Sequence, residues 1–243
     1  MADLERLNAV LRAVIAEGGA DGPQRIGAAC LEYLPVNGAS ITLMTGGGAH
    51  ETVFASDVVM DQLDSLQFNL GEGPCVEAFT QHKPVLVTNL AATDGRWPVF
   101  TNAVRDIPIG GLYVFPLQLG AIALGVLDLY RTEPGDLIGA DLTGALRVAD
   151  AALWSLLGLR VGETLETAAG WGPADSDSWL SGAPLHRTEV YQATGMIIGQ
   201  LGVSAQTALA KLRSVAFAQN RLLDEVARDV VARRLRFDDE ELR

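Results

Sequence analysis

The 243-residue sequence is poor in the residues that build metal centres and disulfide frameworks. It has two cysteines, Cys30 and Cys75, which are too few to staple a small secreted fold. Its three histidines, His50, His82 and His186, lack the close spacing of metal ligands. The sequence also lacks a Walker A motif, a serine nucleophile elbow and a dinucleotide-binding fingerprint. We therefore expect no bound metal, and we expect that the protein is not an enzyme.

Signals for export or membrane insertion are also missing. The N-terminus has no basic region followed by an apolar core, so it does not predict a signal peptide. Residues 107–127 form an uncharged stretch of 21 residues, which is long enough to span a bilayer. Because the stretch contains two prolines and four glycines, we predict two buried strands joined at 119–121 instead. We expect a cytoplasmic protein that does not enter a membrane.

Charge is distributed unevenly along an otherwise ordinary globular composition. The chain is 49% hydrophobic and 20% charged, which excludes wholesale disorder and a collagen-like fold. Its net charge is −12, yet residues 185–237 carry 8 basic and 4 acidic side chains. Residues 1–184 carry 9 basic and 22 acidic side chains, and the tail 238–243 is acidic again. Such asymmetry is typical of a chain with a segment that faces nucleic acid.

Hydrophobic periodicity divides the first 160 residues into helices that flank an antiparallel sheet, which is an α+β pattern. The triple glycine 46–48 predicts a hairpin turn. Apolar residues of 136–160 follow the a/d spacing of paired helices. The predicted helices are 2–17, 23–34, 57–65, 76–81, 99–105 and 136–160, and the predicted strands are 38–45, 51–56, 84–88, 110–117 and 121–130.

Two groups of residues in this part have both a functional and a structural interpretation. Asp57, Asp61 and Asp64 share one face of a predicted helix. They could form a carboxylate metal site, but the interpretation we favour is a solvated acidic face. The segment Gly71-Glu72-Gly73-Pro74-Cys75 is either a tight turn or a loop whose amides line a ligand pocket at a helix start.

Cys75 and Trp97 are the remaining ligand candidates in the first part of the chain. At a helix N-terminus the pKa of Cys75 would fall, and its thiolate would become reactive. The alternative is a small residue packed beneath the loop. Trp97 either stacks on a ligand or anchors its loop to the core. The candidate ligand-binding residues are therefore Gly71, Gly73, Cys75 and Trp97.

The C-terminal part predicts a small helical bundle after a linker. Residues 161–184 lose periodicity and are rich in Gly, Pro, Ser and Asp, which is typical of a linker. Helices are predicted at 185–200, 205–218 and 222–235. Ser204 suits an N-cap, and Asn220 suits a left-handed turn between the last two helices.

Residues 187–235 resemble an ANTAR domain, the RNA-binding three-helix bundle of bacterial transcription antitermination regulators. Thr194 stands where the family often has lysine. The matching residues are Arg187, Ala193, Gly195, Met196, Ala208, Leu212, Arg213, Ala216, Asn220, Leu223, Val226, Ala227 and Val230.

The resemblance implies a surface that contacts RNA. Arginine contacts phosphates and stacks on splayed bases. Small residues on the first helix would allow close approach of a base, or alternatively only close packing of helices. The candidate RNA-binding residues are Arg187, Ala193, Thr194, Gly195, Met196, Arg213 and Arg221.

The first 155 residues resemble a GAF domain in the order of their elements, in GEGPC at 71–75 and in DGRWP at 94–98. The combination is similar to actinobacterial GAF–ANTAR regulators. It implies a GAF-like sensor domain at 1–160 with dimerisation helices at both ends, a linker at 161–184, an ANTAR domain at 185–237 and an acidic tail at 238–243. The resemblance allows a small-molecule GAF ligand but does not identify it.

The leading hypothesis is a signal-responsive RNA-binding antitermination regulator. Helices 2–17 and 136–160 would pair across a homodimer, and the bundles would bind tandem hairpins in nascent mRNA. A second hypothesis is a GAF sensor whose bundle binds protein without RNA. A third is a redox enzyme that uses Cys75 and a second cysteine. A DNA-binding helix-turn-helix fits the predicted helix lengths less well.

Overall fold

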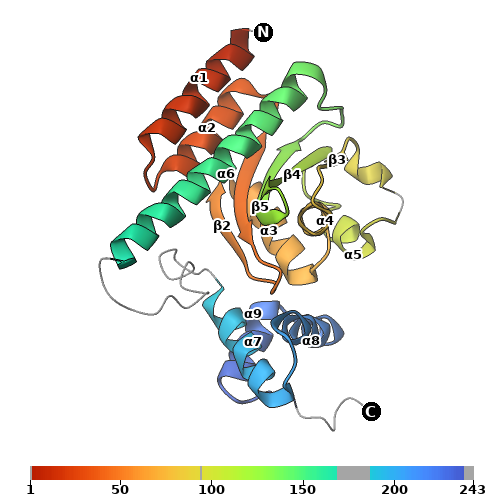
Figure 1. Cartoon of the computed structure of the whole chain (residues 1–243). Helices are drawn as coiled ribbons and strands as arrows, with labels where there is room; N and C mark the ends of the chain where they lie inside the picture. The colour runs from red at the N-terminus through yellow and green to blue at the C-terminus, as the bar shows by residue number, and fades with distance from the viewer. Residues whose placement is uncertain (1, 94, 169–186, 238–243) are drawn as a thin grey trace.

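The computed structural model describes residues 2–93, 95–168 and 187–237, which form a sheet domain followed by a helical bundle (Figure 1). Among the helices of these residues, none has the length and apolar character needed to cross a bilayer. The uncharged stretch at 107–127 is instead part of two paired strands, as the prolines and glycines in it predicted.

A five-stranded antiparallel sheet forms the centre of the first domain, with the strand order β2-β1-β5-β4-β3. The triple glycine joins the outer hairpin, and Gly120 joins the inner one in a left-handed conformation that glycine adopts without steric cost. The strands are β1 (Gly38–Met44), β2 (His50–Ala55), β3 (Val85–Val87), β4 (Gly111–Leu119) and β5 (Ile122–Arg131).

Three helices pack together on one face of the sheet: α1 (Ala2–Glu17), α2 (Gly22–Tyr33) and α6 (Gly139–Ala168) (Figure 1). The apolar spacing of α6 predicted pairing with another helix. That partner lies in the same chain, because Leu153 and Leu156 of α6 are buried in one core with residues of α1 and α2. Leu146 and Trp154 of α6 remain exposed.

The opposite face of the sheet carries the shorter helices α3 (Val58–Leu70), α4 (Pro74–Gln81) and α5 (Pro98–Ala103), with a 3-10 turn at Leu90–Ala92. Their apolar side chains form a second core that includes Met60, Leu63 and Phe100. Helix α3 ends five residues later than the sequence predicted. It ends at Gly71, whose φ of 66° gives the left-handed cap that glycine favours.

The bundle consists of α7 (Thr188–Leu201), α8 (Ala205–Ala218) and α9 (Leu223–Val231), in the order predicted. The Ser204 hydroxyl accepts a hydrogen bond from the Thr207 amide and caps α8, and Asn220 has the expected positive φ of 51°. Helix α9 is shorter than predicted because the chain turns at Arg233, which also has a positive φ. These elements confirm the α+β fold class.

The predicted linker and tail lie mostly outside the described residues. Helix α6 continues to Ala168, beyond its expected end near residue 160, so the first residues of the predicted linker are helical. The rest of the linker and the acidic tail at 238–243 fall outside the part of the chain that the structure describes.

Candidate functional site

Phe68 brings the two domains into contact. It belongs to α3 of the sheet domain, yet its ring is only 1% exposed because it packs into the apolar cluster of the bundle. The cluster includes Val190, Leu209 and Leu212 from α7 and α8. Phe68 therefore serves as an apolar anchor for the bundle.

Asp64 lies one helical turn before Phe68 and is buried in a polar network. Its Oδ1 accepts a hydrogen bond from the Thr42 hydroxyl at 2.9 Å and contacts Nε2 of His50 at 2.6 Å. Its Oδ2 accepts hydrogen bonds from the Thr52 hydroxyl at 2.6 Å and from Nη2 of Arg187 at 2.9 Å. Both oxygens are thus fully engaged, and one partner comes from the bundle.

The expectation of a solvated acidic face over Asp57, Asp61 and Asp64 is wrong for Asp64. Burial alone would raise the pKa of this carboxyl, but the His50 ring and the Arg187 guanidinium hold it well below its usual range. Asp57 instead caps α3 by accepting the amides of Val59 and Met60. Within the described residues no cluster of His, Cys, Asp or Glu could hold a metal ion.

Arg187 joins the bundle to this network. Besides the ion pair with Asp64, its Nη1 donates a hydrogen bond to the His50 carbonyl at 2.8 Å. Its guanidinium lies 4.1 Å from the centre of the Phe68 ring, which is a cation–π distance. Only 11% of the Arg187 side chain is exposed, so in the docked conformation its guanidinium is bound by the sheet domain.

Tyr191, one turn further along α7, completes the docked surface. Its hydroxyl accepts a hydrogen bond from the His50 amide at 3.0 Å and donates one to the His50 carbonyl at 2.7 Å. Burial raises the pKa of Tyr191 to about 12, so the hydroxyl stays protonated and can make both bonds. Tyr191 and Arg187 therefore both bind the backbone of His50 at the start of β2.

Arg213 of α8 places a second guanidinium 5.2 Å from the centre of the Phe68 ring. Unlike Arg187, it makes no ion pair within the described residues, and its Nε is buried without a hydrogen-bond partner there. Burial and the charge of Arg187 lower the pKa of Arg213 to about 10, which still leaves it a cation at neutral pH.

The other candidate RNA-binding residues are not gathered around these two arginines. Ala193 is fully buried in the bundle core, and the Thr194 hydroxyl is turned back to the Val190 carbonyl at 2.7 Å. Gly195 is open, with no atom within 4 Å of the place a Cβ would occupy. Met196 is half-buried, and Arg221 is paired with Asp229 at 2.7 Å.

The glycines of the GEGPC segment provide room for neighbouring side chains. A Cβ on Gly71 would lie 2.9 Å from Nη1 of Arg213. A Cβ on Gly73, whose φ is 136°, would lie 2.7 Å from Oε1 of Gln67. That oxygen accepts a hydrogen bond from the Cys75 amide at 2.7 Å. The segment therefore joins α3 to α4, and Gly71 also lines a cavity beside the bundle.

Of the two interpretations of Cys75, the structure agrees with the small residue packed beneath its loop, since Cys75 is buried. Burial, followed by the charges of Asp128 and Asp64, raises the pKa of the Cys75 thiol instead of lowering it. Cys30 is buried in the core on the other face of the sheet, so the two cysteines cannot form the redox pair of the third hypothesis.

Trp97 is 4% exposed and anchors its loop in the core, with the Arg96 guanidinium 4.7 Å from its ring centre.

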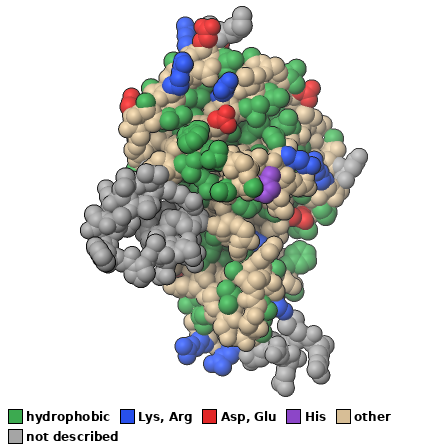
Figure 2. All heavy atoms as spheres, viewed as in Figure 1, with side chains coloured by type: hydrophobic (Ala, Val, Ile, Leu, Met, Phe, Trp, Pro, Cys, Tyr) green, Lys and Arg blue, Asp and Glu red, His purple; other side chains and the backbone are tan. Residues whose placement is uncertain are grey.

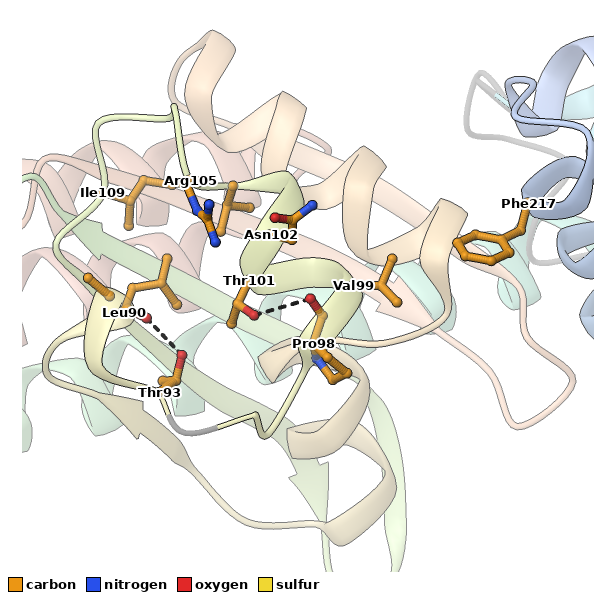
Figure 3. A pocket seen from close by; sticks show the side chains of 11 residues that line it. Leu90, Thr93, Pro98, Val99, Thr101, Asn102, Arg105, Ile109 and Phe217 are labelled. Atoms are coloured by element: carbon orange, nitrogen blue, oxygen red, sulfur yellow. Dashed lines mark hydrogen bonds between the residues drawn. The ribbon is translucent and has the colours of Figure 1, made fainter.

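A further cavity lies between α5 of the sheet domain and α8 of the bundle. The Phe217 side chain points from α8 toward Val99 and lines a cavity of about 640 Å³ with residues of α5 (Figure 3). The Phe217 side chain is 71% exposed.

The exposed arginines of the bundle are Arg228, Arg233, Arg234 and Arg236. Figure 2 shows Lys or Arg side chains at the end of the bundle remote from the sheet domain.

Sequence reasoning missed Phe68 and Tyr191 as residues of the domain contact, and Phe217 as a residue of the second cavity. The sequence pattern predicts that a phenylalanine near the end of a helix, such as Phe68, is buried, but it does not indicate which hydrophobic core the side chain enters. Phe217 did carry a signal, since it is a large aromatic residue next to the apolar stripe of α8.

Comparison with known proteins agrees with this division of the chain. Residues 180–231 match the family model of the ANTAR domain. The structure is similar to the GAF domain of a phosphoenolpyruvate-protein phosphotransferase from Coxiella burnetii, with a TM-score of 0.54 and 13% identity over 67% of this chain and 98% of that one. It is also similar to a domain of a candidate two-component sensor histidine kinase from Sinorhizobium meliloti, with a TM-score of 0.50 and 17% identity over 59% and 94% of the two chains. No curated protein sequence matches the chain.

At these identities the likeness to solved structures shows the fold, which is that of a GAF domain. The bundle that follows carries the ANTAR match. The chain therefore has a GAF–ANTAR architecture, as the sequence predicted.

Proposed function

We propose that this protein is a signal-responsive, RNA-binding regulator of transcription antitermination. The ANTAR bundle would bind tandem hairpins in nascent mRNA and so favour one RNA fold over another, which is a population shift that needs no chemical step. The protein would therefore act by binding and not by catalysis, and it would act in the cytoplasm, where nascent transcripts are made.

The observation that carries the proposal is the position of Arg187 and Arg213. Both are candidate RNA contacts through the ANTAR resemblance, and both lie against Phe68 of the GAF domain. Arg187 is also paired with Asp64, so a carboxylate occupies a place that an RNA phosphate would take. The docked conformation is then the RNA-free state, and release of the bundle from the GAF domain exposes both arginines.

A homodimer is part of the proposal. Ile15 of α1 and Leu146 and Trp154 of α6 are exposed by 40%, 43% and 52%, although other large apolar side chains of these helices, such as Leu11 and Leu153, enter the core. Large apolar side chains exposed on neighbouring helices are typical of an association surface. A second chain that covers them would place two ANTAR bundles within reach of tandem hairpins.

The test is a binding titration of the full-length protein with a labelled tandem-hairpin RNA and a duplex DNA of matched length, each at low and high salt. We expect RNA-selective binding that weakens as salt rises, because cations that contact phosphates displace counterions. Equal affinity for the DNA, or an affinity that salt does not change, would contradict an RNA-binding role.

The alternative is that the bundle is a protein-interaction module that does not bind RNA. The specific observation in its favour is that the bundle already uses Arg187, Tyr191 and Arg213 to bind a protein surface. This function predicts no RNA binding at low salt, both in the wild-type protein and in a variant whose bundle is released.

A further inference from the structure

A cavity of about 530 Å³ lies where the GAF domain meets helix α8 of the bundle. Its volume is within the range of small-molecule sites. The walls come from the β1–β2 and β4–β5 hairpins, from the end of α3, from α4 and from α8. The apolar part of the wall includes Met44, Phe68, Val76, Phe79 and Ile122.

Arg213 gives this cavity its fixed charge. No Asp or Glu is among the described residues that line it, although the chain as a whole has a net charge of −12. The guanidinium fits beside Gly71, because the missing side chain there leaves the space that Nη1 and Cζ occupy. The sequence thus provides both the cation and the room for it.

The neighbouring network cannot neutralise Arg213. Asp64 is the carboxylate that pairs with Arg187, and its two oxygens are already bonded to Thr42, His50, Thr52 and Arg187. The buried Nε of Arg213 has no hydrogen-bond partner among the described residues. A part-buried cation whose Nε lacks a hydrogen-bond partner among these residues has lost hydration without replacing it, and an anion that binds it recovers part of that free energy.

We propose that this cavity binds a small organic anion, in which a carboxylate or phosphate group contacts Arg213 and an adjoining apolar group packs against Val76 and Phe79. Charge-assisted hydrogen bonds to a guanidinium are among the stronger ones in proteins. The side chains of Thr80 and Gln206 line the same cavity and offer further polar contacts.

The site also has a regulatory consequence, which rests on the proposed RNA-binding function. Its walls belong to both domains, so an anion bound there in the docked conformation loses its contacts with Arg213 and Gln206 when the bundle leaves. By linkage, a ligand that binds the docked state preferentially shifts the population toward it. The anion therefore acts as a signal that keeps the bundle on the GAF domain and weakens RNA binding.

The experiment uses the full-length protein and fluorine NMR with three probes: 4-fluorobenzoate, 4-fluorophenyl phosphate and the neutral 4-fluorobenzamide. We expect at least one anionic probe to show line broadening that saturates, and the benzamide to show none. The two anions distinguish a carboxylate ligand from a phosphate ligand. Arg213→Gln is expected to weaken anion binding about tenfold or more, the factor that corresponds to a lost charged hydrogen bond.

Arg6→Gln is the matched control, since it makes the same change of charge on an exposed part of α1. Arg213→Gln removes a part-buried cation that has no ion pair among the described residues, so we expect the variant to fold, and its thermal unfolding checks this. Equal binding of the benzamide, undiminished binding by Arg213→Gln, or no binding of either anion would overturn the proposed site.

A separate RNA titration with saturating 4-fluorobenzoate or 4-fluorophenyl phosphate tests the regulatory consequence. Weaker RNA binding supports it, and an unchanged RNA affinity with the probe bound refutes it. Failure of the protein to bind RNA at all would overturn the proposed function, while the NMR measurement would still decide the anion site.

Discussion

Replacing Phe68 with alanine should release the bundle without unfolding either domain. The ring is 1% exposed, but its apolar neighbours belong to the bundle and not to the GAF core. Truncation of a fully buried phenylalanine costs about 3–5 kcal/mol, which we expect to fall on the docking equilibrium. The variant also removes the ring on which Arg187 and Arg213 lie.

A cost of this size changes the ratio of docked to released protein by about two to four powers of ten. Because apparent affinity scales with the fraction of protein that can bind, we expect Phe68→Ala to bind tandem-hairpin RNA at least about tenfold more tightly than the wild type. Fluorescence anisotropy with a labelled RNA measures this directly. Faster hydrogen exchange of the first turns of α7 would report release independently of RNA.

Val58→Ala is the control on the same helix, since Val58 is 81% exposed and contacts neither core. Its RNA affinity should equal that of the wild type. The reasoning is refuted if Phe68→Ala keeps a native circular dichroism spectrum and faster exchange in α7, yet binds RNA no better than Val58→Ala.

Three further predictions follow from buried groups and exposed faces. Burial, followed by the charge of Asp64, raises the pKa of Asp128 from 3.8 to about 8. Between these values the folded protein holds a proton that the unfolded chain releases, so the free energy of unfolding should fall by about 1.4 kcal/mol per pH unit as pH rises. Asp128→Asn should abolish much of this slope in urea unfolding; an unchanged slope would mean that Asp128 is ionised in the folded protein. Gly73→Ala should cost about 1–3 kcal/mol through its positive φ and the approach to Gln67, whereas Gly46→Ala, with open space around it, should be nearly neutral in the same assay. Trp154→Glu should turn a homodimer into a monomer in sedimentation at micromolar concentration, and a wild-type protein that sediments only as a 25.8 kDa monomer would contradict the dimer.

Local sequence signals predicted most of the helices and strands, because the interactions that start and end them are short-range. Ser204 caps α8, and Asn220 adopts the left-handed turn after it, as their side-chain chemistry indicates. The prolines and glycines of 107–127 predicted paired strands. Helix α9 ended early because Arg233 turns the chain, and an arginine carries no turn signal.

The candidate site was predictable in part. The ANTAR resemblance, together with the charge of the bundle, pointed to Arg187 and Arg213, but as residues open to RNA. Asp64 was expected on a solvated face because its helical spacing from Asp57 and Asp61 is that of an acidic surface. Its burial depends on Thr42, His50 and Arg187, which are distant in the sequence.

The sequence by itself determined the two domains, the elements of each and the concentration of arginine in the second. These follow from periodicity, capping and composition, which act over a few residues. Only the tertiary structure decided that Phe68 enters the bundle's core, that Arg187 has a carboxylate partner and that Arg213 has none among the described residues. The reason is physical: whether a charge is paired, and whether an apolar ring is covered, depends on which surfaces meet, and that is set by contacts across more than a hundred residues of chain.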